Sequence, residues 1–343
     1  MKVAKLYKFN DIRIEKIPIP EINSRQALVK VKACGICSGD VMPWYIEKKA
    51  PLVLGHEISG EIVKIGESIK REITLCEKDR VSVHHHAPCM ECFYCKRGDY
   101  VQCETWRESK IYPGGISEYI VVPEVILKND TLKIPDNVTF EEGAMVEPVA
   151  CVVKSLKRAN IKQGDTILIA GLGIMGQLHI MLAREFGVER IIGVDMVDFR
   201  LKNALEAGAN FVIDLKKDNV YEKVKEITNG IMAQSVIVGP GDVEVIKFYL
   251  QTVSRGGTLL IFTPTPPDQQ ISFSINDIYF KDITITTSYS CGPDDTRKAL
   301  DLISNRKINF NLLITHKFKI EDTQQAYEIT SKAKDSLKCM ITF

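Results

Sequence analysis

The pattern of hydrophobic and polar positions changes character partway along the chain. Up to about residue 135, short segments alternate apolar and polar residues and are separated by glycine. These segments are 27–33, 61–66, 79–83 and 118–123. Short alternating segments bounded by turn residues predict a barrel-like β domain in the first part of the chain.

From about residue 140 the pattern predicts alternating helices and strands. Apolar positions recur at helical spacing over 141–159. Six apolar strand segments follow at 166–170, 190–194, 211–213, 235–238, 258–262 and 283–286, with helices over 174–186 and 200–207. Apolar strands separated by helices predict a parallel sheet covered on both faces. Beyond it we expect helices over 294–304 and 323–332 and strands around Leu312 and 339–341.

Composition narrows the class of protein. The 343 residues are enough for two domains, and 45% hydrophobic with 26% charged residues is typical of a globular protein. A formal net charge of +1 argues against a nucleic-acid or anionic-membrane surface. No apolar run approaches the ~20 residues that span a bilayer. Ten cysteines without an export signal indicate a reducing compartment, so we expect a cytoplasmic protein.

Four of these cysteines lie close together, as Cys89, Cys92, Cys95 and Cys103. Four thiolates can surround one tetrahedral ion and leave no position for substrate, which predicts a structural zinc site. An iron–sulfur cluster can use similar ligands, but its usual spacings differ from this one. Disulfides are disfavoured in the reducing compartment that the composition indicates.

The loop after the first apolar strand of the second half carries a nucleotide-binding pattern. It reads Gly171, Leu172, Gly173, Ile174, Met175 and Gly176, and Asp195 ends the next strand. Glycine allows the tight turn, the close approach of a pyrophosphate and close helix packing, while the helix N-terminus attracts the phosphates. The Asp195 carboxylate would accept hydrogen bonds from the adenosine ribose and repel a 2′-phosphate, which predicts NAD rather than NADP. A strand–helix turn without a ligand is the alternative.

Arg200 follows in the next predicted helix and lies either along the adenine or in solvent.

Three further residue types could form a second metal site. Cys37, His56 and either Glu57 or Glu147 offer the mixed thiolate, imidazole and carboxylate set that leaves a catalytic zinc one open position. Each residue alone is more often an ordinary buried side chain.

These motifs together resemble the zinc-containing medium-chain dehydrogenase/reductase family of alcohol and polyol dehydrogenases. The resemblance spans the chain through the G-I-C of 35–37, the G-H-E of 55–57, the four-cysteine lobe, the segment 114–119 and the glycine-rich loop. It implies Cys37 and His56 as catalytic zinc ligands. Glu147 stands where alcohol dehydrogenases carry a cysteine, as in sorbitol and other polyol dehydrogenases. In that branch either Glu57 or Glu147 completes the zinc shell.

The resemblance also implies the architecture. It divides the chain into a GroES-like catalytic domain with the zinc lobe (1–150), a Rossmann domain (151–287) and a C-terminal return to the catalytic domain (288–343). The active site would lie between the domains. Two zinc ions per chain, NAD and assembly into homodimers or homotetramers are further expectations from the resemblance.

Two positions depart from the family pattern. Gly39 stands where a serine or threonine usually relays the proton, and Met42 stands where a histidine is common. The neighbouring Ser38 offers a hydroxyl. Asp40 would orient a zinc ligand or, alternatively, cap a strand. The proton would leave through water, Ser38 or a substrate hydroxyl.

Several other polar residues carry weaker signals. The run His84-His85-His86 favours a structural turn over metal ligation, and Lys338 reaches either the cofactor pyrophosphate or solvent. The remaining cysteines fit no metal spacing and are interpreted as small buried residues: Cys34, Cys76, Cys151, Cys291 and Cys339.

The expected activity is the NAD-dependent, zinc-dependent oxidation of a secondary alcohol in a polyol or sugar-like small molecule. Zinc as a Lewis acid lowers the pKa of the bound hydroxyl, and the cofactor accepts the hydride. L-Threonine 3-dehydrogenase and a simple secondary alcohol dehydrogenase are alternatives of the same class. A non-catalytic NAD-binding protein is the alternative of another class, suggested by the missing hydroxyl at Gly39.

Overall fold

The computed structural model describes residues 1–343 and divides into two compact units. The first unit comprises Met1–Ala150, Cys291–Arg306 and Ile314–Phe343, and the second comprises Cys151–Ser290 and Lys307–Leu313. The segment 307–313 differs from the expected domain division because it packs with the second unit, where Asn203 donates a hydrogen bond to the Leu312 carbonyl. No helix has the length and apolar character that crossing a membrane requires.

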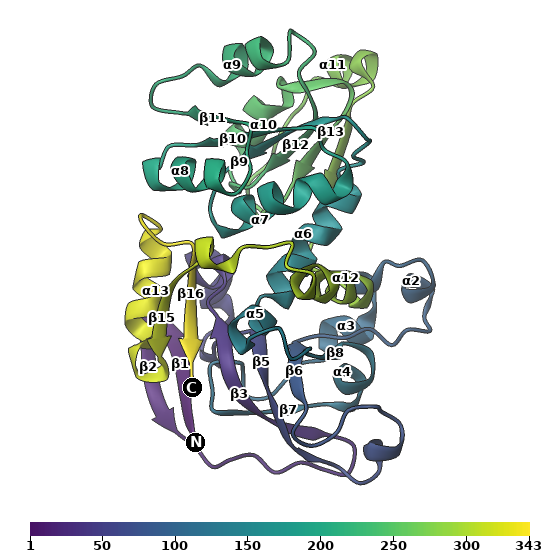
Figure 1. Ribbon diagram of the computed structural model, residues 1–343, viewed down its shortest axis with the longest axis vertical. Helices are drawn as coiled ribbons and strands as arrows, with labels where there is room; N and C mark the ends of the chain where they lie inside the picture. The colour runs from purple at the N-terminus through teal and green to yellow at the C-terminus, as the bar shows by residue number, and fades with distance from the viewer. The chain divides into compact units, whose positions relative to one another are not determined.

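Two β-sheets form the first unit (Figure 1). The larger has seven strands in the order β15-β16-β3-β5-β6-β8, with β7 also paired to β3; the smaller is β2-β1-β4. The larger sheet contains β3 (Ala27–Gly35), β5 (Glu57–Ile65), β6 (Arg80–His84), β7 (Tyr119–Val122), β8 (Thr131–Lys133), β15 (Ile314–Lys319) and β16 (Lys338–Thr342). The smaller contains β1 (Lys2–Lys8), β2 (Asp11–Lys16) and β4 (Leu52–Val53). This is the GroES-like half of the predicted fold.

Short helices connect these strands. They are α1 (Pro43–Ile46), α2 (Phe93–Lys96), α3 (Glu104–Glu108), α4 (Glu124–Asn129), α5 (Phe140–Ala144), α12 (Pro293–Ser304) and α13 (Thr323–Lys332), with 3-10 turns η1 (Ser38–Val41), η2 (Glu47–Lys49), η3 (Ile69–Arg71), η4 (Tyr100–Gln102) and η7 (Ile320–Asp322). The apolar face of β3 packs with β5 and β6 in one continuous core.

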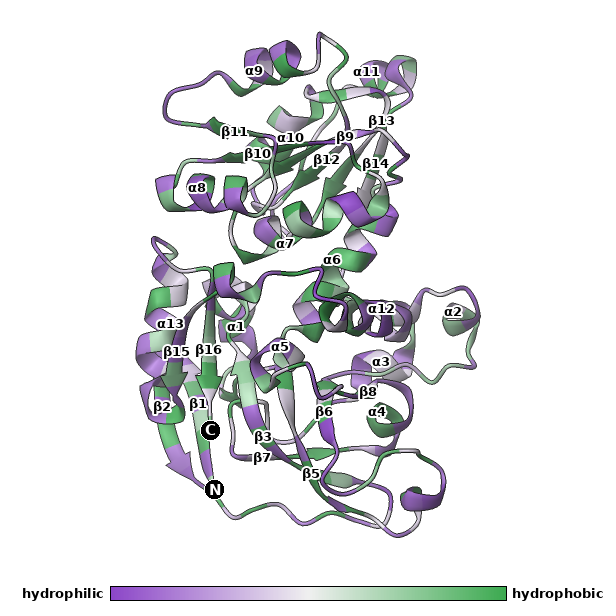
Figure 2. Cartoon of the chain, viewed as in Figure 1, coloured by the Kyte–Doolittle hydropathy of each residue, from purple (hydrophilic) through white to green (hydrophobic).

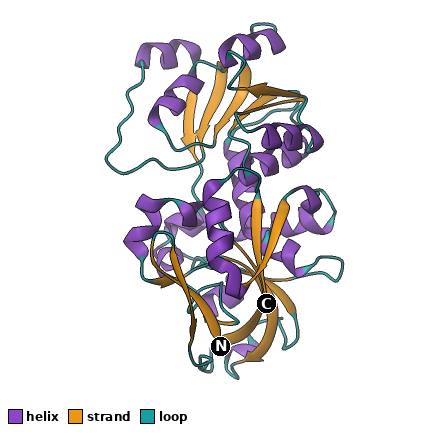
Figure 3. Cartoon of the chain, turned by 90° about the vertical axis from the view of Figure 1, so that its left-hand side faces the viewer, coloured by secondary structure: helices purple, strands orange, loops and turns teal.

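The second unit is a six-stranded, all-parallel sheet in the order β11-β10-β9-β12-β13-β14. The strands are β9 (Thr166–Ala170), β10 (Arg190–Asp195), β11 (Phe211–Asp214), β12 (Ala233–Val238), β13 (Val253–Ile261) and β14 (Thr284–Thr287). Every residue of β9 is buried, so both faces of the sheet are covered, and helices flank it in Figure 3. Figure 2 shows the central strands as hydrophobic along their length. The predicted Rossmann sheet is therefore confirmed.

Helix α6 (Val146–Arg158) begins in the first unit and continues into the second. The other helices of the second unit are α7 (Ile174–Ala183), α8 (Asp198–Glu206), α9 (Val220–Ile227), α10 (Val243–Leu250) and α11 (Ile275–Lys281), with 3-10 turns η5 (Arg184–Phe186) and η6 (Phe310–Leu312).

One sequence prediction of local structure was wrong, and one predicted strand begins slightly later than expected. The helix predicted over 141–159 is two helices, α5 and α6, that meet at Met145. Pro148 has no N–H for the carbonyl of Ala144, which ends the first helix there. The strand predicted around Leu312 is β15, which begins at Ile314, while Leu312 itself lies in the 3-10 turn η6, which the Asn309 side chain caps by accepting from the Asn311 N–H.

Candidate metal and cofactor sites

The four cysteines of the lobe converge on one point. The Sγ atoms of Cys89 and Cys95 are 3.9 Å apart, those of Cys92 and Cys95 3.5 Å, and those of Cys89 and Cys103 3.7 Å. Sulfurs bound to one tetrahedral zinc at about 2.3 Å lie about 3.8 Å apart. The spacing of the four thiols therefore fits a zinc ion without rearrangement.

Backbone N–H groups favour the thiolate at Cys103 of the lobe, whereas burial and contacts with neighbouring cysteines raise the pKa of Cys95 to about 12. The N–H of Cys92 donates to Cys89 Sγ, and the N–H of Cys89 donates to Cys103 Sγ, each at 3.4 Å. Burial raises the pKa of Cys103, but N–H groups of Cys89 and Trp106 outweigh burial and lower its pKa to about 6. Zinc binds the thiolate form, so these contacts prepare the lobe for a metal.

Cys37, His56 and Glu57 form the second group of ligand-type side chains. Cys37 precedes the turn η1, His56 directly precedes β5, and Glu57 is the first residue of β5. One ligand atom from each lies within 4.8 Å of the other two. Strand pairing explains the convergence, because Gly35 of β3 pairs directly with Glu57 of β5. Sulfur, nitrogen and oxygen from three residues are the donor set of an open zinc site.

Negative charge dominates the surroundings of His56. Its Nδ1 lies 3.7 Å from the Asp40 carboxylate, whose Oδ2 is buried and makes no hydrogen bond. Burial opposes protonation of His56, but Asp40 and Cys37 outweigh burial and raise its pKa well above 6.5. Burial also raises the pKa of Asp40. The surrounding negative charges therefore favour the protonated, cationic form of His56.

Lys338 holds the Glu57 carboxylate from the opposite side. Its Nζ donates to both Glu57 oxygens at 2.7 Å and to the Ile36 carbonyl at 3.0 Å, and both side chains are fully buried. Burial lowers the pKa of Lys338, but the charge of Glu57 outweighs burial and raises it. Lys338 therefore lies neither at the expected pyrophosphate position nor in solvent. Its ammonium group balances the charge of the Glu57 carboxylate, which would otherwise be buried without a partner.

Glu147 lies with a different set of ligands. It is the second residue of α6, and its carboxylate lies within 4.8 Å of ring nitrogens of His84 and His85. It still raises the pKa of His56, so the two groups are neighbours. Of the two carboxylates that could complete the shell of Cys37 and His56, Glu57 is the one grouped with them.

The residues around Cys37 include one exposed hydroxyl. Ser38 is exposed at the first position of η1. A Cβ added at Gly39 would lie 3.6 Å from Cys37 Sγ, so a side chain at this position would stand beside the thiolate. Gly39 therefore offers no hydroxyl beside the Cys37 sulfur, where the family pattern has one. Met42 follows the turn as its C-cap and supplies no titratable group.

The glycine-rich loop has the geometry that a pyrophosphate requires. Gly171 has φ +87°, a left-handed conformation that favours glycine, and a Cβ at Gly176 would lie 2.1 Å from the Gly171 carbonyl oxygen. Gly173 caps α7, and a Cβ there would meet no atom within 4 Å. Ile174 and Met175 begin α7 directly after it. The space beside Gly173 at this helix N-terminus is open, as an anion site needs.

Asp195 ends β10 and ties the loop in place. Its Oδ2 accepts from the Leu172 N–H at 2.7 Å, and its Oδ1 accepts from the N–H groups of Met196 and Val197 at 2.7 and 2.9 Å. Arg200 of α8 lies 3.5 Å from the same carboxylate. The structure thus brings the predicted loop, acid and arginine together in one unit.

Substituting Gly173 by alanine tests the loop as a cofactor site. Because no atom lies near the added Cβ and φ is −65°, the fold should tolerate the change. The methyl would occupy space that the pyrophosphate needs, so the Kd for NADH should rise at least about tenfold, ~1.4 kcal/mol. A fluorescence titration measures the Kd. Gly176→Ala is the contrast: it should lower the melting temperature as well, because its Cβ meets backbone.

Sequence reasoning missed three contributors to these groups. His84 was assigned to a turn, Cys291 to simple packing and Lys338 to the cofactor or solvent. Cys291 Sγ lies 3.7 Å from His84 Nε2, although 207 residues separate them. The alternating pattern of the strand that ends at His84 is the only sequence signal that this side chain is buried. No local spacing indicates that His84 pairs with Cys291.

Comparison with known proteins gives matches along nearly the whole chain. Residues 23–136 match the alcohol dehydrogenase GroES-like domain, and residues 175–305 match the zinc-binding dehydrogenase domain. A sorbitol dehydrogenase from Bombyx mori is 32% identical over 353 residues, covering 98% of this chain and 97% of that protein. D-xylulose reductase A from Aspergillus oryzae is 30% identical over 343 residues, covering 96% and 93%.

A solved structure extends the likeness to the tertiary level. A protein of Sinorhizobium meliloti 1021, assigned as a zinc-binding dehydrogenase and solved with NADP bound, superposes with a TM-score of 0.87 at 25% identity. The match covers 100% of this chain and 99% of that one.

Proposed function

Because the chain belongs to the zinc-containing medium-chain dehydrogenase/reductase family, among its polyol dehydrogenases, we propose that it oxidises a secondary alcohol of a polyol or sugar-like substrate with NAD. The family establishes a zinc-dependent oxidoreductase that uses a nicotinamide cofactor. The observation that carries the finer proposal is the convergence of Cys37, His56 and Glu57 beside an acid-rich environment.

Two zinc ions per chain are part of the proposal. Cys37, His56 and Glu57 would hold the catalytic ion, and the four cysteines of the lobe would hold the structural ion. The donor types and spacings on both sites fit zinc. When bound at the first site, zinc supplies a Lewis acid that lowers the pKa of a substrate hydroxyl. For Glu57 to serve as a ligand, one of its oxygens must turn from Lys338.

The protein's own residues orient this site and conduct the proton. Asp40 lies behind His56 and would fix its ring through Nδ1, leaving the other nitrogen for the metal. Lys338 donates to both oxygens of the Glu57 carboxylate and balances its charge inside the core. With glycine at position 39, the proton of the alcohol would pass through water to the exposed Ser38 hydroxyl and then to solvent.

We attribute the preference for NAD to the Asp195 charge. A carboxylate at the end of β10 repels a 2′-phosphate, although the Sinorhizobium relative was solved with NADP. Asp195→Asn removes the charge and should lower the ratio of kcat/KM with NAD to kcat/KM with NADP about tenfold, ~1.4 kcal/mol. Initial rates with both cofactors measure this ratio. An unchanged ratio in a variant that still melts like the parent protein would assign cofactor choice to other residues.

The substrate class is tested with a panel. Metal-replete enzyme is mixed with NAD and with polyols, inositols, L-threonine or simple secondary alcohols, and the formation of NADH is followed by absorbance. We expect turnover with a polyol. Turnover confined to L-threonine or to simple alcohols would overturn the substrate class. If NADH binds but no compound turns over, the polyol proposal fails for every substrate tested.

Assembly and location complete the proposal. Ile275, Tyr279 and Phe280 of α11 are each more than 70% exposed. In the same unit β14 is an edge strand of the sheet. Exposed apolar side chains and an edge strand favour association between copies, so we propose a homo-oligomer, a tetramer or a dimer. Ten cysteines, several of them grouped as metal ligands, fit the cytoplasm.

A further inference from the structure

A lysine lies over an aromatic ring close to the proposed catalytic metal ligands. Lys49 ends the 3-10 turn η2, and its Nζ lies 3.8 Å from the centre of the Tyr45 ring in α1. An ammonium group this close to the face of a ring is attracted to it by a cation–π interaction. The Lys49 side chain therefore has a defined place, although the residue is exposed.

The Tyr45 ring connects this lysine with the Cys37 group. A Cβ added at Gly39 would lie 3.6 Å from Cys37 Sγ and 4.0 Å from Tyr45 Cε1. Because residue 39 is a glycine, no side chain from this position separates the ring from the sulfur. The edge of the Tyr45 ring thus lies near the proposed metal site, and its face carries the Lys49 ammonium group.

The segment that carries Tyr45 and Lys49 is anchored in the core of the first unit. Pro43 begins α1, where its fixed φ favours the start of a helix. Ile46, the last residue of α1, is 1% exposed and packs in the core cluster of this unit. The packing of α1 therefore sets the position of the ammonium group relative to Cys37.

No carboxylate balances the charge of Lys49. Lys49 forms no ion pair, whereas Lys338 is paired with Glu57. The neighbouring imidazoles add no positive charge, because burial lowers the pKa of His86 to about 4 and that of His85 well below 6.5. The charge of Lys49 lowers both of these pKa values further, so the ammonium group lies within electrostatic range of both rings.

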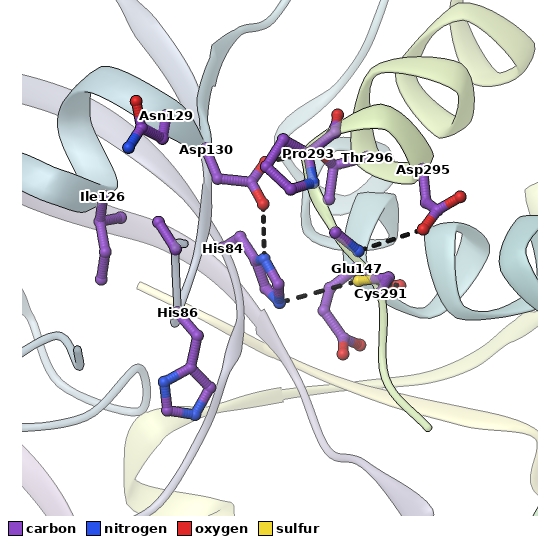
Figure 4. A network of polar contacts seen from close by, with 12 residues as sticks. His84, His86, Ile126, Asn129, Asp130, Glu147, Cys291, Pro293, Asp295 and Thr296 are labelled. Carbon is purple, nitrogen blue, oxygen red and sulfur yellow. Dashed lines mark hydrogen bonds and ion pairs between the residues drawn. The ribbon is translucent and has the colours of Figure 1, made fainter. Parts of the chain in front are cut away.

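The histidines that flank this region already have partners of their own. His84 Nδ1 lies 2.7 Å from the Asp130 carboxylate, and His84 Nε2 lies 3.7 Å from Cys291 Sγ. Figure 4 shows these three side chains as one network, with the His86 ring apart from it. The His86 Nδ1–H donates to the Ser109 carbonyl. Lys49 is therefore the group on this side of the Cys37 site that can recognise an added negative charge.

We propose that Lys49 binds an anionic group of the substrate, so that the enzyme prefers a polyol or sugar derivative that carries a carboxylate or a phosphate. This inference rests on the proposed function, because the Cys37 group must hold the reacting alcohol. The anionic group lies a few bonds from the reacting carbon, since Lys49 reaches the Cys37 group by way of the Tyr45 ring. A lysine ammonium pairs with either kind of anion as a point charge.

A comparison of charged and neutral substrates gives the first test. kcat/KM with NAD is measured for an aldonate, a polyol phosphate and the corresponding neutral polyol. The ratio of charged to neutral substrate should exceed one, and it should fall at least about tenfold in Lys49→Gln, the loss expected for one charge-assisted contact. The anion with the larger loss is the natural one. Equal ratios in the parent protein and in Lys49→Gln would overturn the proposal.

The neighbouring lysine supplies the matched control. Lys48 lies in the same turn η2 and is also exposed, but it does not contact the Tyr45 ring. Lys48→Gln removes the same charge from the same segment, so a general electrostatic effect would lower the ratio equally in both variants. We expect Lys48→Gln to keep the ratio of the parent protein, and an equal loss in both variants would overturn the assignment to Lys49.

A binding measurement separates this proposal from the proposed reaction. The Trp44 ring lies 5.7 Å from the Tyr45 ring, so an anion at Lys49 should change the tryptophan emission of the zinc-loaded protein. The Kd for the polyol phosphate or the aldonate should rise at least about tenfold in Lys49→Gln. Anion binding in a protein that oxidises no alcohol would overturn the proposed function and keep the anion site. Turnover of neutral polyols without anion binding, or a raised Kd for NADH in Lys49→Gln, would overturn the anion site alone.

Discussion

Cys37→Ser is expected to abolish turnover while the fold and cofactor binding persist. Serine lacks the thiolate that the proposed catalytic zinc requires, and Cys37 lies in the first unit, whereas the glycine-rich loop lies in the second. Loss of Lewis-acid activation removes several kcal/mol of transition-state stabilisation. We expect kcat/KM for the best substrate to fall at least about 10³-fold, ~4 kcal/mol. Initial rates and an NADH titration on the same sample measure both properties.

The exposed Cys76 supplies the control for this variant. Cys76→Ser should keep full activity, because Cys76 belongs to no group of metal ligands. Elemental analysis should show one zinc fewer in Cys37→Ser than in Cys76→Ser. Persistent turnover in Cys37→Ser, with that zinc lost, would show that Cys37 does not carry the reaction.

Cys92→Ser is expected to unfold the zinc lobe without removing the catalytic residues. The lobe has little hydrophobic core of its own, formed by Cys95, Val101, Cys103 and Trp106. Metal binding must therefore supply most of its stability, and structural zinc contributes roughly 10–16 kcal/mol in small zinc domains. Trp106 is buried in the lobe, so opening should shift tryptophan emission to longer wavelength. Thermal melting followed by this emission should show an early transition in the variant.

A chelator distinguishes metal loss from simple side-chain damage in this experiment. The unaltered protein treated with chelator should acquire the same early transition, whereas Cys92→Ser should respond little. Cys76→Ser again serves as the control and should melt like the parent protein. An emission spectrum and a melting curve that Cys92→Ser leaves unchanged would mean that the lobe folds without its metal.

Local spacing was enough to predict two of the sites. The four lobe cysteines span 15 residues of sequence, and a short chain segment can adopt few paths that bring such neighbours together; their sulfurs converge as expected. The glycine-rich loop is equally local, since the close approach of Gly176 to the Gly171 carbonyl follows from one turn between a strand and a helix. The apolar run of β9 predicted a strand buried on both faces for the same local reason.

Other assignments depended on strand pairing that no local pattern encodes. Lys338 reaches Glu57 because β16 pairs with β3 and β3 pairs with β5, which joins residues 281 positions apart. From the sequence, Lys338 could be assigned either to the cofactor or to solvent, because its actual partner depends on the order of strands in the sheet. The choice between Glu57 and Glu147 was open in the sequence for the same reason, and the folded chain separates them into two neighbouring groups.

The sequence by itself determined the family, the two fold types, the glycine-rich loop between strand and helix, and the residue types proposed as metal ligands, because each rests on short-range spacing or on hydrophobic periodicity. Only the tertiary structure decided which side chains face each other: Lys338 on Glu57, His84 on Cys291, and the segment 307–313 with the second unit. These contacts depend on the order and register of strands far apart in the chain, where each pairing is set by the packing of the whole core.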